Sequence, residues 1–260
     1  MSKAYSLFKN NQLLESLKVL MKAADQAILE VYQSDDFEME TKGDSSPVTK
    51  ADLAAHHVLL DGLSQLTPDI PVVSEEDPNS LNIPKTNPTF WLIDPLDGTK
   101  EFIKRNGEFT CNLALIENQI TTLGFVSIPE KGELYYGGKE MGAFRVIQQS
   151  QPEQIKYATA PSITRVVASK SHLNKETQDF IANQSGTVEL VQAGSSLKFL
   201  KIATGLADLY PRLAPTCEWD TAAAHAVLEG AGGQVTQTDG SPLTYGKDNI
   251  LNPFFIASAN

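Results

Sequence analysis

Two carboxylates stand close together in the segment Trp91–Thr99, which reads WLIDPLDGT. An apolar run ends at Asp94, a proline then stiffens the chain, and Asp97 follows just before a glycine that permits a tight turn. Unit charges roughly 4 Å apart repel by about 4 kcal/mol at an effective dielectric constant of about 20. A hard divalent cation removes this repulsion and prefers oxygen ligands, to which the backbone carbonyl of Leu96 can be added. The segment therefore indicates a divalent-cation site.

A surface turn is the alternative interpretation, because Asp, Pro and Gly are common turn residues. The residues before Asp94 are apolar and aromatic, however, which favours a carboxylate at the end of a buried strand. A second β-like run, Ile70–Val73, also leads into acids, Glu75 and Glu76, and ligands gather at strand ends in α/β proteins. Successive side chains of an extended segment point in opposite directions, so we expect only one glutamate, and rather Glu75, to face the site.

A further acid, Asp220, precedes a segment of small residues that is expected to be helical. A carboxylate at a helix start is commonly an N-cap, but the same terminus also favours a phosphate group, so both interpretations stay open. The pair Thr49 and Asp52 at the start of another predicted helix is likewise either a capping pair or a catalytic pair.

Basic side chains follow the acidic turn directly, at Lys100, Lys104 and Arg105. The chain has 260 residues and a formal net charge of −11, so cations beside an acidic site suggest an anionic substrate. An ordinary solvated basic face is the alternative. The overall negative charge disfavours nucleic acid and acidic lipid as partners.

The chain is expected to be cytoplasmic. Its first ten residues lack the apolar core of a signal peptide, and no apolar run approaches the roughly 20 residues that span a bilayer. The cysteines, Cys111 and Cys217, suit a reducing compartment and make neither a disulfide framework nor a zinc motif. Peripheral attachment to the inner membrane and the oligomeric state stay open.

Hydrophobic periodicity predicts the elements that position these residues. Helices are predicted over Leu13–Val31, Lys50–Gln65, Lys175–Ala182, Ser196–Thr204 and Thr221–Glu229. Strands are predicted over Ile70–Val73, Phe90–Ile93, Cys111–Ile116, Ile120–Ile128, Glu133–Tyr136, Val166–Ala168, Val188–Val191, Ala207–Tyr210 and Gln234–Thr236. The second helix is expected to bury Leu53, Val58, Leu59 and Leu63. The acidic segment Ser34–Ser46 before it is either a loop or a short strand pair.

The connections indicate two differently built parts. Short turns between the early strands favour antiparallel pairing, whereas the later alternation of strands and helices favours α/β layering. The composition changes near Gln148–Pro161. We expect an α/β protein with an α+β part at residues 1–150, which holds a mixed or antiparallel sheet and the metal site, and an α/β part at residues 151–260.

Three segments together resemble the signatures of the inositol monophosphatase-like, lithium-sensitive metal phosphatases: Trp91–Thr99 followed by Phe102, Trp219–Ala224, and Ser74–Glu76. Their order and spacing agree with that superfamily, and the resemblance spans most of the chain. Within it, the chain is most similar to the 3′(2′),5′-bisphosphate nucleotidases of the CysQ type. This similarity is carried by DPLDGTKEFI from Asp94, NGEFT from Asn106, SPVT from Ser46 with Asp52, VAS from Val167 with Ser171 and His172, and GSSLK from Gly194.

The resemblance implies a layered α-β-α-β-α fold and roles for individual residues. The ligands of two or three Mg²⁺ ions would be Glu75, Asp94, the Leu96 carbonyl, Asp97 and Asp220. The catalytic residues would be Asp52, Glu75 and Thr99, of which Asp52 assists the water-activating metal and Thr99 orients the water. Substrate contacts would come from the metal ligands together with Gly98, Thr99, Lys100, Ser195, Ser196, Lys198 and Arg212.

The resemblance also implies a reaction. A magnesium-dependent phosphatase would hydrolyse the 3′-phosphate of adenosine 3′,5′-bisphosphate, a by-product of sulfate assimilation, to AMP and phosphate. The part after residue 150 would complete the site and bind the nucleotide. One alternative is a sister phosphatase acting on inositol phosphates or fructose 1,6-bisphosphate. A catalytically silent nucleotide-binding regulator is the other, and it is disfavoured because no carboxylate of the set is missing.

Overall fold

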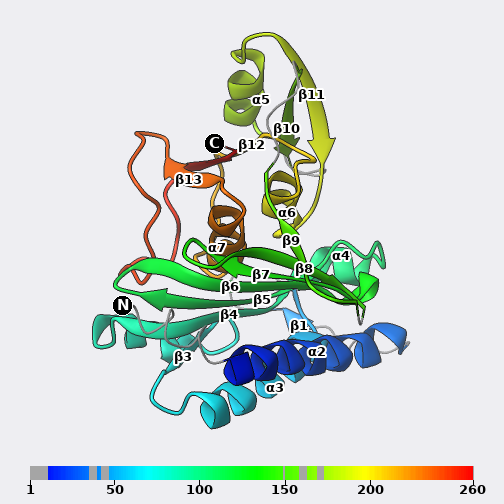
Figure 1. Ribbon diagram of the computed structural model, residues 1–260, viewed down its shortest axis with the longest axis vertical. Coiled ribbons are helices and arrows are strands. Elements are labelled where there is room, and N and C mark those ends of the chain that lie inside the picture. The colour runs from blue at the N-terminus through cyan, green and yellow to red at the C-terminus, as the bar shows by residue number, and fades with distance from the viewer. Residues whose placement is uncertain are drawn as a thin grey trace.

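A computed structural model describes residues 11–34, 40–41, 47–148, 150–157, 163–168 and 173–259. The motif residues Ser46, Ser169, Ser171 and His172 lie outside this part of the chain, as does most of the acidic segment after Ser34. Within it, helices and sheets alternate in layers along the long axis of the molecule (Figure 1). This is the layered α-β-α-β-α arrangement expected from the sequence.

The larger sheet has seven strands in the order β3-β4-β5-β6-β7-β8-β9. Its strands are β3 (Val72–Ser74), β4 (Thr89–Asp97), β5 (Thr110–Glu117), β6 (Ile120–Ile128), β7 (Glu133–Gly138), β8 (Gly142–Ile147) and β9 (Glu153–Ile155). The expected antiparallel pairing is confirmed from β4 to β9, while β3 runs parallel to β4. Strands β8 and β9 were not predicted.

Two long helices cover one face of this sheet, α2 (Asn11–Gln33) and α3 (Lys50–Leu66) (Figure 1). The burial of Leu59 and Leu63 confirms the predicted apolar side of α3. The prediction that α3 buries Leu53 is wrong, because this side chain is 41% exposed. The buried stripe runs through Ala51 and Ala55, on the other side of the helix. In the chain between α2 and α3, the short strands β1 (Glu40–Thr41) and β2 (Pro47–Val48) pair antiparallel; β1 lies within the segment expected to be a loop or a strand pair, and β2 lies just after it.

Strand β4 does not stop at Ile93 as predicted but continues to Asp97. Its pairing with β5 is irregular between Asp94 and Asp97, where Pro95 has no N–H group to donate to the ladder. The Leu96 N–H turns back to Oδ1 of Asp94 at 3.1 Å. This irregularity holds both carboxylates at one end of a buried strand.

The smaller sheet has five strands in the order β11-β10-β12-β14-β13. They are β10 (Ile163–Ala168), β11 (Thr187–Gln192), β12 (Leu209–Arg212), β13 (Gln234–Gln237) and β14 (Phe255–Ser258), of which β14 was not predicted. Pairing is parallel from β11 through β10 to β12 and antiparallel beyond. Helix α5 (Lys175–Ala182) packs near β12, and short helical segments occupy α4 (Thr99–Ile103), η1 (Pro78–Lys85) and η2 (Pro129–Lys131).

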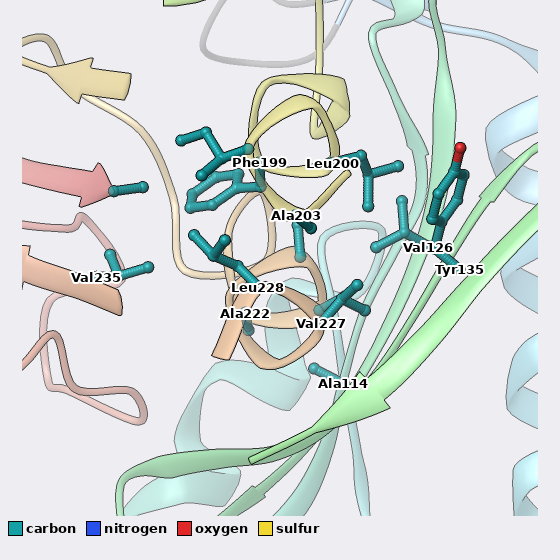
Figure 2. Packing of buried hydrophobic residues seen from close by; sticks show 14 of the residues in the cluster. Ala114, Val126, Tyr135, Phe199, Leu200, Ala203, Ala222, Val227, Leu228 and Val235 are labelled. Carbon is teal, nitrogen blue, oxygen red and sulfur yellow. The ribbon is translucent and has the colours of Figure 1, made fainter. Parts of the chain in front are cut away.

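Helices α6 (Leu197–Ala203) and α7 (Ala222–Gly230) lie between the two sheets. Figure 2 shows Phe199 of α6 and Leu228 of α7 packed together, with Val126 on the larger sheet and Val235 on the smaller. Helix α7 approaches β6 so closely that a Cβ atom on Gly124 would lie 2.0 Å from the carbonyl oxygen of Ala223. The alanine-rich start of α7 therefore fixes the residues just before it against the sheet.

The division at residue 150 stays a prediction. The larger sheet ends at Ile155 and the smaller begins at Ile163, so the change of sheet follows β9. Among the described residues, no helix has the length and apolar character needed to cross a bilayer.

Asp25 on α2 makes stability depend on pH. Burial raises the pKa of Asp25 to about 7. A hydrogen bond of 2.5 Å from Ser127 Oγ has the opposite, smaller effect on this pKa. The folded state therefore holds this proton more tightly than the unfolded chain does, and stability falls as the pH rises from about 4 to about 7. We expect Asp25→Asn to stabilise the protein by about 2 kcal/mol more at pH 8 than at pH 5, measured by urea denaturation. Glu30→Gln, at an exposed acid of the same helix, is the control; equal effects of Asp25→Asn at both pH values would contradict the prediction.

Candidate active site

Three carboxylates far apart in the chain converge at one point. Glu75 follows β3, Asp94 lies in β4 and Asp220 precedes α7, and each offers an oxygen within 4.8 Å of the other two. The parallel pairing of β3 with β4 brings the first two together, and the N–H of Glu75 donates to the Ile93 carbonyl at 3.2 Å. Glu76 is not in this group of described residues, which agrees with the expectation that only Glu75 faces it.

Asp94 is the most deeply buried of the three, with 1% exposure. Its Oδ2 atom is buried without a hydrogen-bond partner among the described residues. Burial raises the pKa of Asp94 well above its ordinary value, and the negative charges of Glu75, Asp97, Asp220 and Asp52 raise it further. Such a carboxylate lacks a positive partner within the described protein.

Asp97 is held by neutral donors. Its Oδ2 accepts the Ser196 N–H at 2.7 Å and the Thr110 hydroxyl at 3.4 Å. Burial and then Asp220 raise the pKa of Asp97 to about 6, while Lys198 and the hydrogen bonds from Ser196 lower it. Asp97 therefore lies in the same acidic field as the three clustered carboxylates.

Asp220 is oriented by the turn that precedes it. Its Oδ2 accepts the Thr216 hydroxyl at 2.5 Å and the Cys217 N–H at 2.8 Å. The N-cap of α7 is Thr221, so the N-cap interpretation of Asp220 is wrong. Ser196 Oγ donates to the Asp220 carbonyl at 2.9 Å, so the residue whose N–H binds Asp97 also binds Asp220.

Gly98 and Thr99 form the turn that follows the acidic strand. Gly98 has φ 95°, in the left-handed region that glycine tolerates, and precedes the short helix α4. Ser195 Oγ lies against this turn and donates to the carbonyls of Asp97 and Glu108, both at 3.0 Å. Ser195 thus supports the turn, whereas Ser196 holds the carboxylate of Asp97 and the backbone of Asp220.

Asp52 belongs both to a cap and to the site. With Thr49 it forms the capping box of α3, accepting the Thr49 N–H at 2.8 Å and hydroxyl at 2.7 Å on Oδ2. Its Oδ1 accepts the Thr99 hydroxyl at 3.2 Å. The two interpretations of this pair are therefore compatible, and helix α3 carries a carboxylate to the Gly98–Thr99 turn.

The basic side chains near the site differ in burial and in hydrogen-bond partners. Lys198 is buried, its Nζ donates to the Ser195 carbonyl at 2.6 Å, and burial lowers its pKa to about 8 against the opposing effect of Asp97. Arg212 donates to the Pro215 carbonyl at 2.6 Å, and Lys100 is exposed. Arg105 donates to the carbonyls of Tyr32 and Ser34 at the end of α2.

Sequence reasoning missed four residues that shape the site. Thr110 and Thr216 donate to acids, Asn112 lies opposite Asp94 in the sheet, and buried Glu218 binds Lys247 and its loop. Thr110 ends the NGEFT motif, but neither that motif nor any local pattern assigns roles to Thr110, Asn112 and Thr216, because these roles depend on the pairing of β4 with β5 and on a turn geometry. Glu218 stands two residues before Asp220, and its position alone does not distinguish a structural acid from a ligand.

The donor set fits a divalent cation. All the candidate side-chain ligands are carboxylate oxygens, and Asp94 Oδ2 lacks a hydrogen-bond partner among the described residues. Hard cations such as Mg²⁺ take oxygen ligands of this kind. A cavity of about 630 Å³ beside α2 contains none of the predicted site residues, so it is separate from this centre.

The fold and the site together define a layered α/β protein with a carboxylate centre that fits a divalent cation. The model of the inositol monophosphatase family matches residues 9–254. The chain therefore belongs to the inositol monophosphatase family.

Two CysQ proteins and an inositol monophosphatase show how similar this chain is to individual relatives. The 3′(2′),5′-bisphosphate nucleotidase CysQ of Escherichia coli O6:H1 is 44% identical over 95% of this chain and 99% of that protein. The crystal structure of CysQ from Bacteroides thetaiotaomicron is 39% identical, with a TM-score of 0.85, over 96% of this chain and 97% of that one. An inositol monophosphatase from Anabaena shares the fold, with a TM-score of 0.72 at 24% identity over 96% of this chain and 91% of that one.

Gly98 provides a test of the turn geometry. A Cβ atom there would lie 2.2 Å from Ser195 Oγ, in addition to the strain of the positive φ. We expect Gly98→Ala to reduce the free energy of unfolding by at least about 1 kcal/mol, measured by urea denaturation. Gly186→Ala is the matched control, because Gly186 has φ 84° but nothing within 4 Å of its added Cβ. Equal losses in the two variants would show that the Ser195 contact contributes nothing.

Proposed function

We propose that this chain hydrolyses the 3′-phosphate of adenosine 3′,5′-bisphosphate to AMP and phosphate. It is an enzyme, a 3′(2′),5′-bisphosphate nucleotidase that recycles a by-product of sulfate assimilation. The observation that carries the proposal is the 44% identity to a CysQ nucleotidase over nearly the whole of both chains. The convergence of Glu75, Asp94 and Asp220 supports it, because phosphoryl transfer depends on positioned cations.

The cofactor in this proposal is Mg²⁺. Its ligands would be Glu75, Asp94, Asp97, Asp220 and the Leu96 carbonyl, with the number of ions in turnover left to measurement. When bound, Mg²⁺ would supply Lewis acidity for the phosphoryl group and for water.

The protein's own acid–base device is the pair of Thr99 and Asp52. Because the Thr99 hydroxyl donates its proton to Asp52 Oδ1, its oxygen lone pairs are available to accept a hydrogen bond from the attacking water. Asp52 in turn is fixed on its other oxygen by Thr49. The proton lost by the water can thus pass through the Thr99 hydroxyl to Asp52.

The phosphate and the nucleotide would be held by different groups. The backbone at Gly98 and Thr99 holds the phosphate in this proposal, at a turn that Ser195 supports. Lys198 lies near both Asp97 and Arg212, so these two cations can compensate phosphate charge beside the acids. Lys100 is exposed and would contact substrate only at the rim of the site. A nucleotide bisphosphate is the proposed small-molecule partner; the cytoplasmic location stays a prediction.

Asp94→Asn tests the metal site. The amide keeps the volume of the side chain but removes a charged ligand, so we expect the rate of phosphate release to fall at least about 100-fold, which corresponds to about 3 kcal/mol. The melting temperature without metal should not fall, because a buried charge that repels its neighbours is removed. Glu76→Gln is the matched control and should keep near wild-type activity. Normal turnover of Asp94→Asn at saturating Mg²⁺ would refute the ligand assignment.

A substrate panel tests the reaction itself. We expect kcat/KM for adenosine 3′,5′-bisphosphate to exceed the values for inositol 1-phosphate and fructose 1,6-bisphosphate, with Mg²⁺ required and Li⁺ inhibiting phosphate release. A preference for either sugar phosphate would favour the sister phosphatases. Nucleotide that is bound but left intact would favour the silent regulator. Inclusion of 3′-phosphoadenosine 5′-phosphosulfate measures the preference between the two adenine nucleotides.

A further inference from the structure

Asn112 on β5 is a buried polar side chain without partners. It is 1% exposed, and neither its amide nitrogen nor its amide oxygen has a hydrogen-bond partner among the described residues. Buried amides in folded proteins are almost always hydrogen-bonded, so such a group calls for an explanation. On the same face, the following residue Ala114 and the partner across to β6, Val126, are apolar, and the preceding residue Thr110 donates its hydroxyl to Asp97.

The register of the sheet places Asn112 directly opposite Asp94. Opposed residues of an antiparallel pair project from the same face, with Cβ atoms about 5 Å apart. Asp94 Oδ2 is likewise buried and without a partner in the described part of the chain. Within the described part of the chain, a donor that lacks an acceptor therefore stands opposite an acceptor that lacks a donor.

From this juxtaposition we infer that Asn112 is a positioning residue of the metal site, whose amide N–H donates to Asp94 Oδ2 and fixes that carboxylate for cation binding. The inference rests on the proposed function, in which Asp94 is a metal ligand. The other acids have comparable support: Ser196 and Thr110 orient Asp97, and Thr216 orients Asp220. Groups that orient metal ligands typically contribute 10- to 100-fold to metal affinity or activity.

Asn112→Leu is the first test, because leucine has nearly the same shape and no polar atoms. Binding of Mn²⁺ alone, without substrate, is measured by the electron paramagnetic resonance signal of the free ion. We expect the Mn²⁺ dissociation constant to rise about tenfold. The metal-free melting temperature should not fall, because in the described arrangement, which holds no cation, the amide makes no hydrogen bond that leucine would lose. If Asn112 served only the packing of the strand, Asn112→Leu would instead lower the melting temperature and leave the Mn²⁺ dissociation constant unchanged.

A second pair of variants keeps the inference testable if leucine is not accommodated. Asn112→Thr and Asn112→Val have the same shape and differ only in a hydroxyl donor. We expect the threonine variant to bind Mn²⁺ more tightly than the valine variant. Thr67→Val is the control for loss of a buried polar group elsewhere, since Thr67 Oγ1 accepts the Trp91 indole N–H at 2.8 Å; it should lose stability but keep its Mn²⁺ affinity.

The Mn²⁺ binding results distinguish a failure of the positioning role of Asn112 from a failure of the proposed metal site. Wild-type affinity in Asn112→Leu, or equal affinity in Asn112→Thr and Asn112→Val, would overturn the positioning role. If the wild-type chain did not bind Mn²⁺, or Asp94→Asn bound it equally well, the proposed metal site itself would fail. Weaker binding in Asn112→Leu at undiminished stability, with Thr67→Val unaffected in affinity, would support the role of Asn112.

Discussion

Mutual repulsion among buried carboxylates is the constraint on which the rest of the molecule depends. Asp94 is buried among other acids, and both its burial and their charges raise its pKa. The donors that hold Asp94 and Asp97 are mainly neutral N–H and hydroxyl groups, which orient the acids without cancelling their charge. The positive charge of Lys198 lowers the pKa of Asp97, but its ammonium group donates to the Ser195 carbonyl, and burial lowers its own pKa. The acids are thus held in place while a large negative charge remains, which a divalent cation can neutralise.

Such a cluster persists only if rigid elements hold it, and the layers supply them. The irregular end of β4 presents two acids, β3 brings Glu75 beside them, and the close contact of α7 with Gly124 fixes the chain just after Asp220. Ser196 at the start of α6 then binds Asp97 through its N–H and the Asp220 carbonyl through its hydroxyl. The site therefore forms only when the layer between the two sheets is packed against the larger one, so its assembly is coupled to folding of the core.

Local patterns in the sequence were sufficient where a single element decides the outcome. The periodicity of α2 and α3 and the apolar runs of β5 and β6 predicted those elements, and the Asp-Pro-Leu-Asp-Gly-Thr turn indicated the acidic site. Prediction was poorer where distant contacts decide. Strand β9 has three residues and β14 four, and each is defined by its neighbours in a sheet. The exposure of Leu53 and the role of Arg105 likewise depend on which surfaces pack together, which periodicity alone does not specify.

Asn112 illustrates the same limit within the site. The four residues that follow it in β5 are apolar, and only the register of β4 against β5 reveals that it faces Asp94. A side chain selected for stability alone would be apolar at this position, because its neighbours Ala114 and Val126 belong to the core. The cluster of acids is unfavourable for folding in the same sense, since removing its charges relieves repulsion. Asn112 and the cluster of acids therefore both make the fold less stable than apolar residues would, and both prepare a cation site. This trade-off is expected where function, rather than packing, determines the residue.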